Sequence, residues 1–153
     1  MLKPFCLIAA LAAMGCTTHA AEPLPFDAVA AEAKAGIDFV DNAHIQARQA
    51  ANKDLLLIDV RTASEFDLGH IPGATWIPRG RSEFEIAKTV RDASTEIILY
   101  CKTGSRAALV KKALDAQGYN NVSAHAGFET WANAGLPFSN ALGTVQLIAQ
   151  PAE

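Results

Sequence analysis

Two features that mark other protein classes are missing from this sequence: a long hydrophobic run and an excess of positive charge. No window approaches the roughly 20 apolar residues that a spanning helix needs, so we expect no membrane span. The 13 Lys and Arg residues are outnumbered by 16 Asp and Glu residues, and the formal net charge is −3. No nucleic-acid partner is therefore expected. The sequence also contains no internal repeat and no low-complexity segment.

Candidate metal ligands are too few for a metal site. The chain has three cysteines and four histidines, and neither His44 nor His125 has a partner at metal-binding spacing. A structural zinc ion needs a full tetrahedral set of ligands, which this sequence does not supply. We therefore expect no metal.

The composition that remains is typical of one packed domain. Half of the 153 residues are hydrophobic and 19% are charged, a balance that suits a globular core rather than a disordered chain. The length fits one ordinary domain and is short for two.

The first residues have the pattern of an export signal. Lys3 precedes an apolar run over 5–15, and small residues follow up to Ala21. This order predicts a signal peptide over residues 1–20 and a periplasmic protein. A buried first helix is the structural alternative. A second alternative is a lipoprotein signal cut before Cys16, because residues 13–16 loosely resemble the lipoprotein cleavage pattern.

Export would leave one informative cysteine. Cys6 is removed with the signal, and Cys16 is either removed or lipidated, so Cys101 would be the only free thiol of the mature chain. An unpaired cysteine in an oxidising compartment is a liability unless it performs chemistry. Cys101 is therefore the first candidate for a reactive residue.

Short apolar segments alternate with helical patterns along the rest of the chain. We expect strands over 55–60, 75–78, 96–100 and 121–124, and helices over 38–53, 62–70, 83–93 and 107–117. This alternation predicts the α/β class, with an open parallel sheet flanked by helices on both faces. The domain should span 37–139, after a spacer over 21–36 that holds a short helix. The tail over 140–153 has no predicted place.

The segment after the third of these strands combines several features of an anion site. It consists of Cys101, Lys102, Thr103, Gly104, Ser105 and Arg106. A strand that ends at Cys101, followed by a glycine-containing loop and a helix, places the thiol where ligands bind in open α/β sheets. Backbone amides at a helix N-terminus and two nearby cations favour the thiolate over the thiol. An inert buried cysteine would not need these surroundings.

Three blocks in this order resemble the rhodanese family. The loop from Cys101 to Arg106 matches the pattern C-x-x-G-x-R. The blocks 59–74 (DVRTASEFDLGHIPGA) and 127–137 (GFETWANAGLP) resemble the upstream and closing signatures of the family. The likeness covers about residues 37–139 and departs from the usual pattern at Ala126, where the family has a glycine. The periplasmic single-domain type is the most similar kind.

The resemblance implies a sulfurtransferase in which Cys101 carries sulfur as a persulfide. The partners would be a small anionic donor such as thiosulfate and a thiol or cyanide acceptor, with a protein acceptor as a further possibility. The backbone amides from Lys102 to Arg106, which include those of Thr103, Gly104 and Ser105, would cradle the sulfur, and the Arg106 side chain would orient the donor. This chemistry needs no organic cofactor.

Several residues near these blocks are assigned structural roles. Asp59 is expected to pair with a cation or an amide, and Arg61 with Glu65 in a fold-holding ion pair. His70 is expected to make a local hydrogen bond. Trp76 and Trp131 are expected to pack in the core.

Two other functions compete with a sulfurtransferase. Cysteine-dependent phosphatases of the same fold have a longer loop, C-x5-R, whereas here Arg106 follows Cys101 at C-x4-R. The shorter loop leaves no room for phosphate and disfavours a phosphatase. A sulfane-sulfur-binding or persulfide-delivery protein that serves a specific partner stays open, because the sequence does not separate it from an enzyme of broad turnover.

Overall fold

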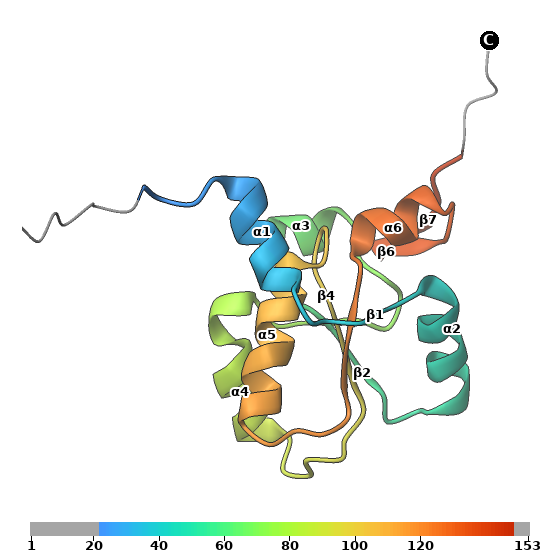
Figure 1. Cartoon of the computed structure of the whole chain (residues 1–153). Helices are drawn as coiled ribbons and strands as arrows, with labels where there is room; N and C mark the ends of the chain where they lie inside the picture. Colours follow the sequence, from blue (N-terminus) through green and yellow to red (C-terminus); the bar gives the residue numbers. More distant parts are fainter. Residues whose placement is uncertain (1–21, 149–153) are drawn as a thin grey trace, which may run out of the picture.

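The computed structural model describes residues 22–148, so the predicted signal peptide lies outside the described residues. A central parallel sheet organises this part of the chain, with helices on both sides (Figure 1). The strand order is β1-β5-β4-β2-β3, and all neighbouring strands in it are parallel. The strands are β1 (Phe39–Val40), β2 (Leu56–Asp59), β3 (Thr75–Trp76), β4 (Ile97–Tyr100) and β5 (Val122–His125). The predicted α/β class and open parallel sheet are confirmed.

Six α-helices and one 3-10 turn connect and cover these strands within residues 22–148. They are α1 (Phe26–Lys34), α2 (Asn42–Ala51), α3 (Ala63–Leu68), η1 (Arg79–Arg81), α4 (Ser82–Thr89), α5 (Ser105–Ala116) and α6 (Phe128–Asn133). Local capping explains two of the starts. The Asp41 side chain accepts from the His44 amide at the start of α2, and Thr62 and Glu65 form a reciprocal capping box at α3.

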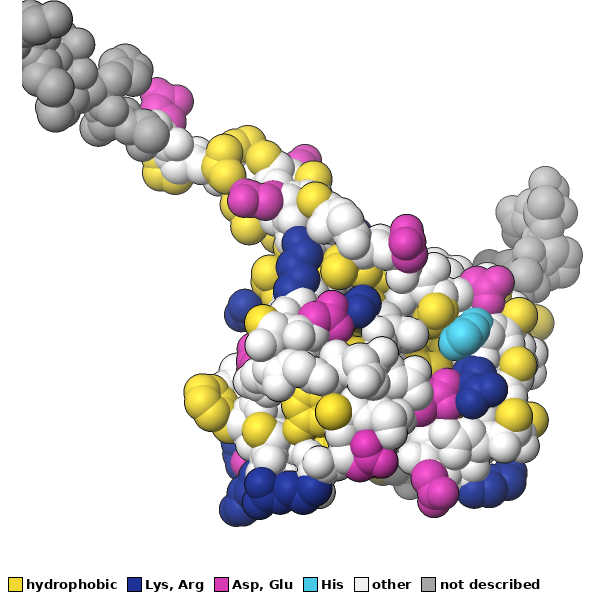
Figure 2. Space-filling view, turned by 60° about the horizontal axis from the view of Figure 1, so that its bottom comes forward, with side chains coloured by type: hydrophobic (Ala, Val, Ile, Leu, Met, Phe, Trp, Pro, Cys, Tyr) yellow, Lys and Arg dark blue, Asp and Glu magenta, His cyan; other side chains and the backbone are white. Residues whose placement is uncertain are grey.

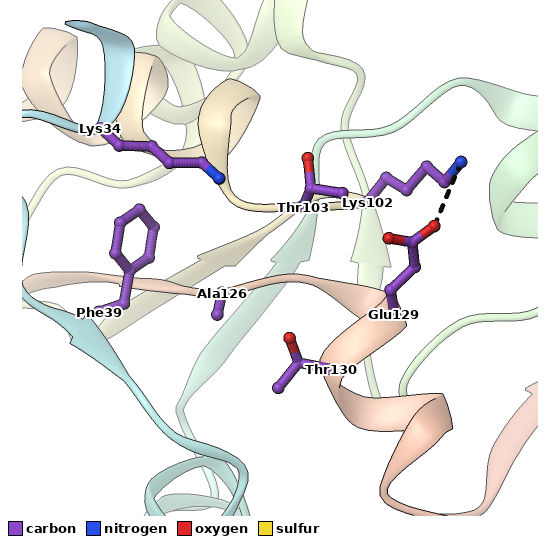
Figure 3. Close-up of a pocket in the computed structure, with 7 residues that line it drawn as sticks. All are labelled: Lys34, Phe39, Lys102, Thr103, Ala126, Glu129 and Thr130. Carbon is purple, nitrogen blue, oxygen red and sulfur yellow. Dashed lines mark ion pairs between the residues drawn. The ribbon is translucent and has the colours of Figure 1, made fainter. Parts of the chain in front are cut away.

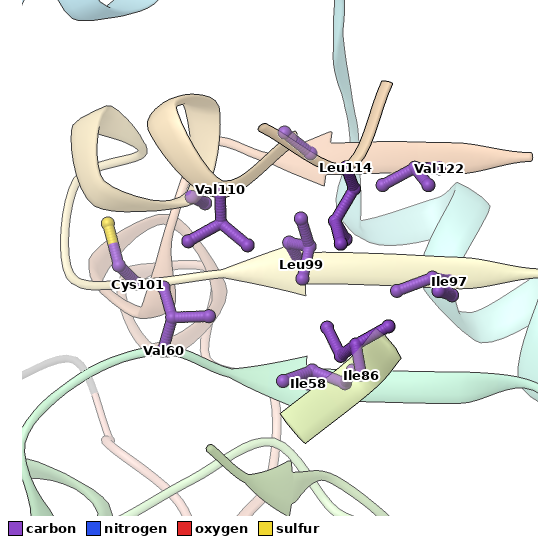
Figure 4. Packing of buried hydrophobic residues seen from close by; sticks show 11 residues of the cluster. Ile58, Val60, Ile86, Ile97, Leu99, Cys101, Val110, Leu114 and Val122 are labelled. Atoms are coloured by element: carbon purple, nitrogen blue, oxygen red, sulfur yellow. The ribbon is translucent and has the colours of Figure 1, made fainter. Parts of the chain in front are cut away.

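Alternation along the two central strands divides the core into two layers. Ile58 and Leu99 face α4 and α5, where they pack with Val110 and Leu114 (Figure 4). Their neighbours Leu57, Ile98 and Tyr100 face the other side and pack with Ile45 of α2 and Trp131 of α6. Strands buried on both faces read as continuous apolar runs, which is why β2 and β4 were predictable from the sequence. Cys101 belongs to the layer on the α5 side.

The predicted boundaries need four corrections. Residues 39–40 form β1, so the helix predicted from residue 38 begins only after the Asp41 cap. The helix predicted to residue 93 ends at Thr89. Helix α5 begins at Ser105 rather than at residue 107. The unplaced tail contributes to an antiparallel hairpin of β6 (Phe138–Asn140) and β7 (Gly143–Val145), and His70 pairs with Ser139 of that hairpin.

The segment predicted as a spacer contains the expected short helix. Helix α1 lies against α5, with Ala33 buried and the Lys112 ammonium donating to the Glu32 carbonyl at 3.2 Å. Phe26 and Val29 on the same helix stay 83% and 50% exposed. Hydrophobic side chains accordingly gather on the N-terminal segment where it joins the body of the molecule (Figure 2). No helix among the described residues is long and apolar enough to cross a membrane.

Candidate active site

Cys101 follows directly on the central strand β4 and is 1% exposed. Figure 4 shows its sulfur pointing from the end of β4 towards the first turn of α5. The Gly104 amide donates to the Cys101 sulfur at 3.2 Å. Gly104 has φ +91°, and a Cβ there would lie 3.0 Å from the Phe39 ring, so both conformation and space require glycine. The loop thus directs an amide and a helix N-terminus at the sulfur.

The segment after β5 supports the loop from behind. The Phe128 amide donates to the Cys101 carbonyl at 2.7 Å, and the Glu129 amide donates to the Lys102 carbonyl at 3.2 Å. Between them the backbones come so close that a Cβ on Gly127 would lie 2.2 Å from the Lys102 carbonyl oxygen. Gly127 also has φ +123°. A glycine is therefore required at residue 127. Residue 126 has no positive φ, so alanine is tolerated there in place of the glycine of the usual pattern.

His125 fixes Gly127 in turn. The Gly127 amide donates to Nδ1 of His125 at 3.1 Å, which makes Nδ1 an acceptor and assigns the proton to Nε2. Nε2 then donates to Oδ1 of Asn42 at 2.8 Å. Burial lowers the pKa of His125 to about 4, so the imidazole is neutral at physiological pH. His125 therefore supports the loop through Gly127, a role that no sequence pattern indicated.

Arg106 does not present a free guanidinium to the pocket. Its two terminal nitrogens donate to both carboxylate oxygens of Glu65 at 2.8 and 2.7 Å. The hydrogen bond from Arg106, with further bonds from Thr62, lowers the pKa of Glu65 to about 2. The same bond to Glu65 raises the pKa of Arg106, and the charge of Cys101 adds to the rise. Arg106 is therefore part of an ion pair beside the thiol.

Asp59 and Arg61 form a separate buried pair. Nε and a terminal nitrogen of Arg61 donate to the Asp59 carboxylate at 2.6 to 3.0 Å, and the side chains are 4% and 0% exposed. Arg61 also donates to the Gly69 carbonyl at 2.6 Å and lies 4.3 Å from the Phe128 ring centroid. The predicted Arg61–Glu65 pair is wrong, because Arg61 pairs with Asp59 and Glu65 pairs with Arg106. The predicted pairing of Asp59 with a nearby cation is confirmed.

Of the remaining loop residues, Lys102 and Thr103 are exposed and Ser105 is half-buried. The Lys102 ammonium lies 3.2 Å from the Glu129 carboxylate, with both side chains about half exposed. Figure 3 shows this pair at the edge of a pocket of about 340 Å³, into which Lys34 and Phe39 also project beside Thr103. Lys102 is thus a solvated charge on the rim of the loop rather than a residue in contact with the sulfur.

Three further expectations have clear outcomes. The His70 ring nitrogen Nδ1 lies 3.0 Å from the Phe66 carbonyl, which confirms a local hydrogen bond. Trp131 is 3% exposed and packs in the core as expected. Trp76 is 37% exposed, so the prediction of core packing is wrong there; its indole donates to the Arg61 carbonyl at 3.0 Å instead.

The structure adds residues to the site that sequence patterns did not single out. A groove of about 550 Å³ contains Cys101 and Arg106, and one of its walls is α1. Arg79, from the turn after β3, also lines this groove. Residues 22–148 supply no ion-pair partner to Arg79. Only the chain fold brings α1 and Arg79 to the thiol.

Comparison with known proteins identifies the family. The model of the rhodanese-like domain matches residues 42–134. The chain belongs to the rhodanese-like domain family. It is 30% identical over 102 residues to a sulfurtransferase of Allochromatium vinosum, a match that covers 66% of this chain and 94% of the relative. Sulfur transfer is the general activity that this family membership supports.

Solved structures agree with the fold. A rhodanese from E. coli, solved with anions, has 28% sequence identity and a TM-score of 0.51, and the match covers 57% of this chain and 99% of that one. A Rhodopseudomonas palustris protein, described as of unknown function and a possible tyrosine phosphatase, has 28% identity and a TM-score of 0.60. That match covers 76% of this chain and 98% of that one.

Proposed function

We propose that this rhodanese-like protein is a sulfurtransferase that moves a sulfane sulfur from thiosulfate, or a similar anionic donor, to a thiophilic acceptor. The observation that carries the proposal is the position of Cys101. Its sulfur lies at the carboxyl end of the central strand, accepts the Gly104 amide at 3.2 Å and borders a groove of about 550 Å³. A nucleophile with an amide donor and a helix N-terminus suits an anionic substrate.

The first half-reaction loads sulfur onto Cys101. The Cys101 thiolate forms a bond from Sγ to the outer sulfur of thiosulfate, and the sulfur–sulfur bond of thiosulfate breaks. The electron pair of that bond leaves with sulfite, and Cys101 keeps the outer sulfur as a persulfide anion. The Gly104 amide and the start of α5 stabilise this anion by the same interactions that favour the thiolate.

The second half-reaction returns the thiolate. The persulfide anion takes up a proton from water, and an acceptor, which is cyanide or a thiolate, then attacks the outer sulfur and leaves with it as thiocyanate, which releases the proton, or as an organic persulfide, which keeps it. The Sγ–S bond breaks, and its electron pair stays on Sγ. Arg106 supports both steps as the cationic member of an ion pair beside Cys101, with its guanidinium held by Glu65.

Persulfide delivery to a dedicated protein partner is the second candidate. It is favoured by a hollow of about 380 Å³ next to Lys102, lined by Leu68 and Leu147 among others. These two side chains are 78% and 51% exposed. A protein that only delivers sulfur would accept it from thiosulfate and release it slowly to cyanide or small thiols.

The decisive experiment is the intact mass of the protein before and after exposure to thiosulfate. We expect a gain of one sulfur atom, which is lost again on addition of cyanide. Cys101→Ser should show no gain and no thiosulfate:cyanide activity, because an alcohol cannot hold a persulfide, while its thermal melt stays close to that of the wild type. Sulfur loading of the serine variant would contradict the mechanism.

We also propose that the protein is exported to the periplasm. The support for this is the sequence of residues 1–20, which lie outside the described part of the structure. N-terminal sequencing of the fractionated protein should find Ala21 first in the periplasmic fraction. A lipid-modified Cys16 in the membrane fraction would contradict this and identify a lipoprotein.

A further inference from the structure

The groove that contains Cys101 has an apolar wall made by α1, to which α5 adds Leu109. The residues of this wall are Phe26, Val29, Ala30, Ala33 and Leu109. The wall is a fixed part of the fold, because Ala33 is buried and α1 lies against α5.

The size and lining of this groove exceed what a small inorganic anion uses. A volume of about 550 Å³ is that of a site for an organic molecule. Thiosulfate and cyanide offer no hydrocarbon to Phe26 or Val29, which remain 83% and 50% exposed. An apolar chain placed on this wall would remove that surface from water, and each buried methylene would strengthen binding.

One cation in the groove is available to an anionic group. Arg106 is bound by Glu65, and Lys102 lies next to Glu129. Arg79 lines the groove, is exposed, and has no ion-pair partner within residues 22–148. An arginine in this position suits a carboxylate, which it can bind with two parallel donors.

We infer that the acceptor is an organic thiol with an apolar chain and a terminal carboxylate. The chain lies along Phe26 and Val29, the carboxylate contacts Arg79, and the thiol reaches the persulfide of Cys101. This inference rests on the proposed sulfur transfer. The acceptor thiolate forms a bond to the outer sulfur, the Sγ–S bond breaks, and its electron pair returns to Cys101 as thiolate. The organic persulfide leaves with the outer sulfur and its proton.

The test is a series of acceptors of matched chemistry, with thiosulfate as donor. Mercaptoacetate, mercaptopropionate and mercaptohexanoate differ in chain length, and mercaptohexanol replaces the carboxylate of the longest by an alcohol. We expect kcat/KM to rise about two- to fourfold per methylene. We expect mercaptohexanoate to exceed mercaptohexanol about fivefold, because the alcohol loses a charge-assisted contact.

Variants assign these preferences to residues. Phe26→Ala should reduce the preference for mercaptohexanoate over mercaptoacetate about fivefold, whereas Phe84→Ala, at a phenylalanine that is 77% exposed on α4, should leave it unchanged. Arg79→Gln should abolish the preference for mercaptohexanoate over mercaptohexanol. Arg81→Gln is its matched control, since Arg81 is bound by Glu85 outside the groove.

The outcomes separate this inference from the proposed function. If cyanide accepts sulfur but kcat/KM is independent of thiol chain length, the organic acceptor is wrong and sulfur transfer stands. The inference would also be overturned by a chain-length preference that persists in Phe26→Ala, or by a preference for mercaptohexanoate over mercaptohexanol that persists in Arg79→Gln. If neither cyanide nor any thiol removes sulfur and no mass gain is seen with thiosulfate, the proposed function itself fails.

Discussion

Arg106 illustrates how one residue can be close to the chemistry without being free to bind the substrate. Both terminal nitrogens of Arg106 are engaged by Glu65, so the charge next to Cys101 is that of an ion pair. The potential at the thiol then depends on both partners. Glu65 is therefore part of the site. Its removal would leave the Arg106 guanidinium unpaired beside the thiol, and the removal of Arg106 would leave the Glu65 carboxylate unpaired there.

Arg106→Ala should lower kcat/KM for thiosulfate about ten- to hundredfold, because the donor then meets an unpaired carboxylate instead of a neutral pair. The double variant Glu65→Gln/Arg106→Ala should recover part of this loss, since it removes the unpaired charge. Steady-state kinetics on both variants measures the effect. A double variant as poor as the single one would mean that the Arg106 guanidinium contacts thiosulfate directly.

The buried pair of Asp59 and Arg61 contributes to the stability of the fold. Arg61 is 4% exposed and contacts the Asp59 carboxylate, the Gly69 carbonyl and the Phe128 ring. Asp59→Asn leaves the Arg61 guanidinium buried without a counter-ion, which should lower the free energy of unfolding by about 3–5 kcal/mol. Urea denaturation is the measurement.

The control for Asp59→Asn is a pair at the surface. Glu85→Gln removes the partner of Arg81, where the two side chains are 37% and 66% exposed. Exposed ion pairs of this kind contribute about 0–1 kcal/mol to the free energy of unfolding, so the midpoint of urea denaturation should barely move. Equal losses in the two variants would contradict the assignment of Asp59 and Arg61 as the central buried pair.

At the scale of elements, the contact between the active-site loop and the start of α6 decides the shape of the site. Gly127→Ala should reduce sulfur loading by Cys101 at least tenfold, because the new Cβ would overlap the Lys102 carbonyl and displace the loop. Sulfur loading is followed by intact mass. Gly143→Ala is the matched control: its φ of +113° resembles the +123° of Gly127, but nothing lies within 4 Å. The control should lose some stability and keep its loading rate.

Elements with a local cause were predictable from the sequence. Strands β2 and β4 are continuous apolar runs, and the turn from Cys101 into α5 follows from a glycine after a buried strand. Strand β1 was missed because two residues are too few to show a hydrophobic periodicity, and its only partner in the sheet is β5. The partner of Glu65 was predicted wrongly for a related reason: Arg61 is near it in sequence, but the fold brings Arg106 to Glu65 and leaves Arg61 paired with Asp59.

The sequence did not predict which residues line the groove, because only the tertiary structure brings them together. Helix α1 was expected only as a short helix in a spacer, and no sequence pattern indicates that it reaches Cys101. Arg79 belongs to no motif of the sequence, and arginine side chains are mostly exposed, so its place at the site was not predictable. Both become members of the site because α1 packs on α5 and the turn after β3 ends beside the thiol.

For the whole molecule, Glu65 and His125 make the stability of the fold fall with decreasing pH in two successive pH windows. The pKa of Glu65 is lowered from 4.5 to about 2 in the folded protein, so its contribution is present above pH 4.5 and is lost as the pH falls towards 2. His125 acts at higher pH. Its pKa is lowered from 6.5 to about 4, so the unfolded chain binds the extra proton first and stability falls between these values.

His125→Asn should remove the upper window. Asparagine keeps an acceptor for the Gly127 amide but cannot be protonated, so the variant should be somewhat less stable at pH 7 and nearly flat between pH 6.5 and 4. The wild type should lose on the order of 3 kcal/mol over the same interval. Urea denaturation at a series of pH values measures both profiles. In the folded protein the imidazole stays neutral until the pH approaches 4, so sulfur loading by the wild type should fall through loss of the Gly127 contact only near that value, and loading by the variant should not. A variant with the same pH profile as the wild type would assign the acid sensitivity to another group.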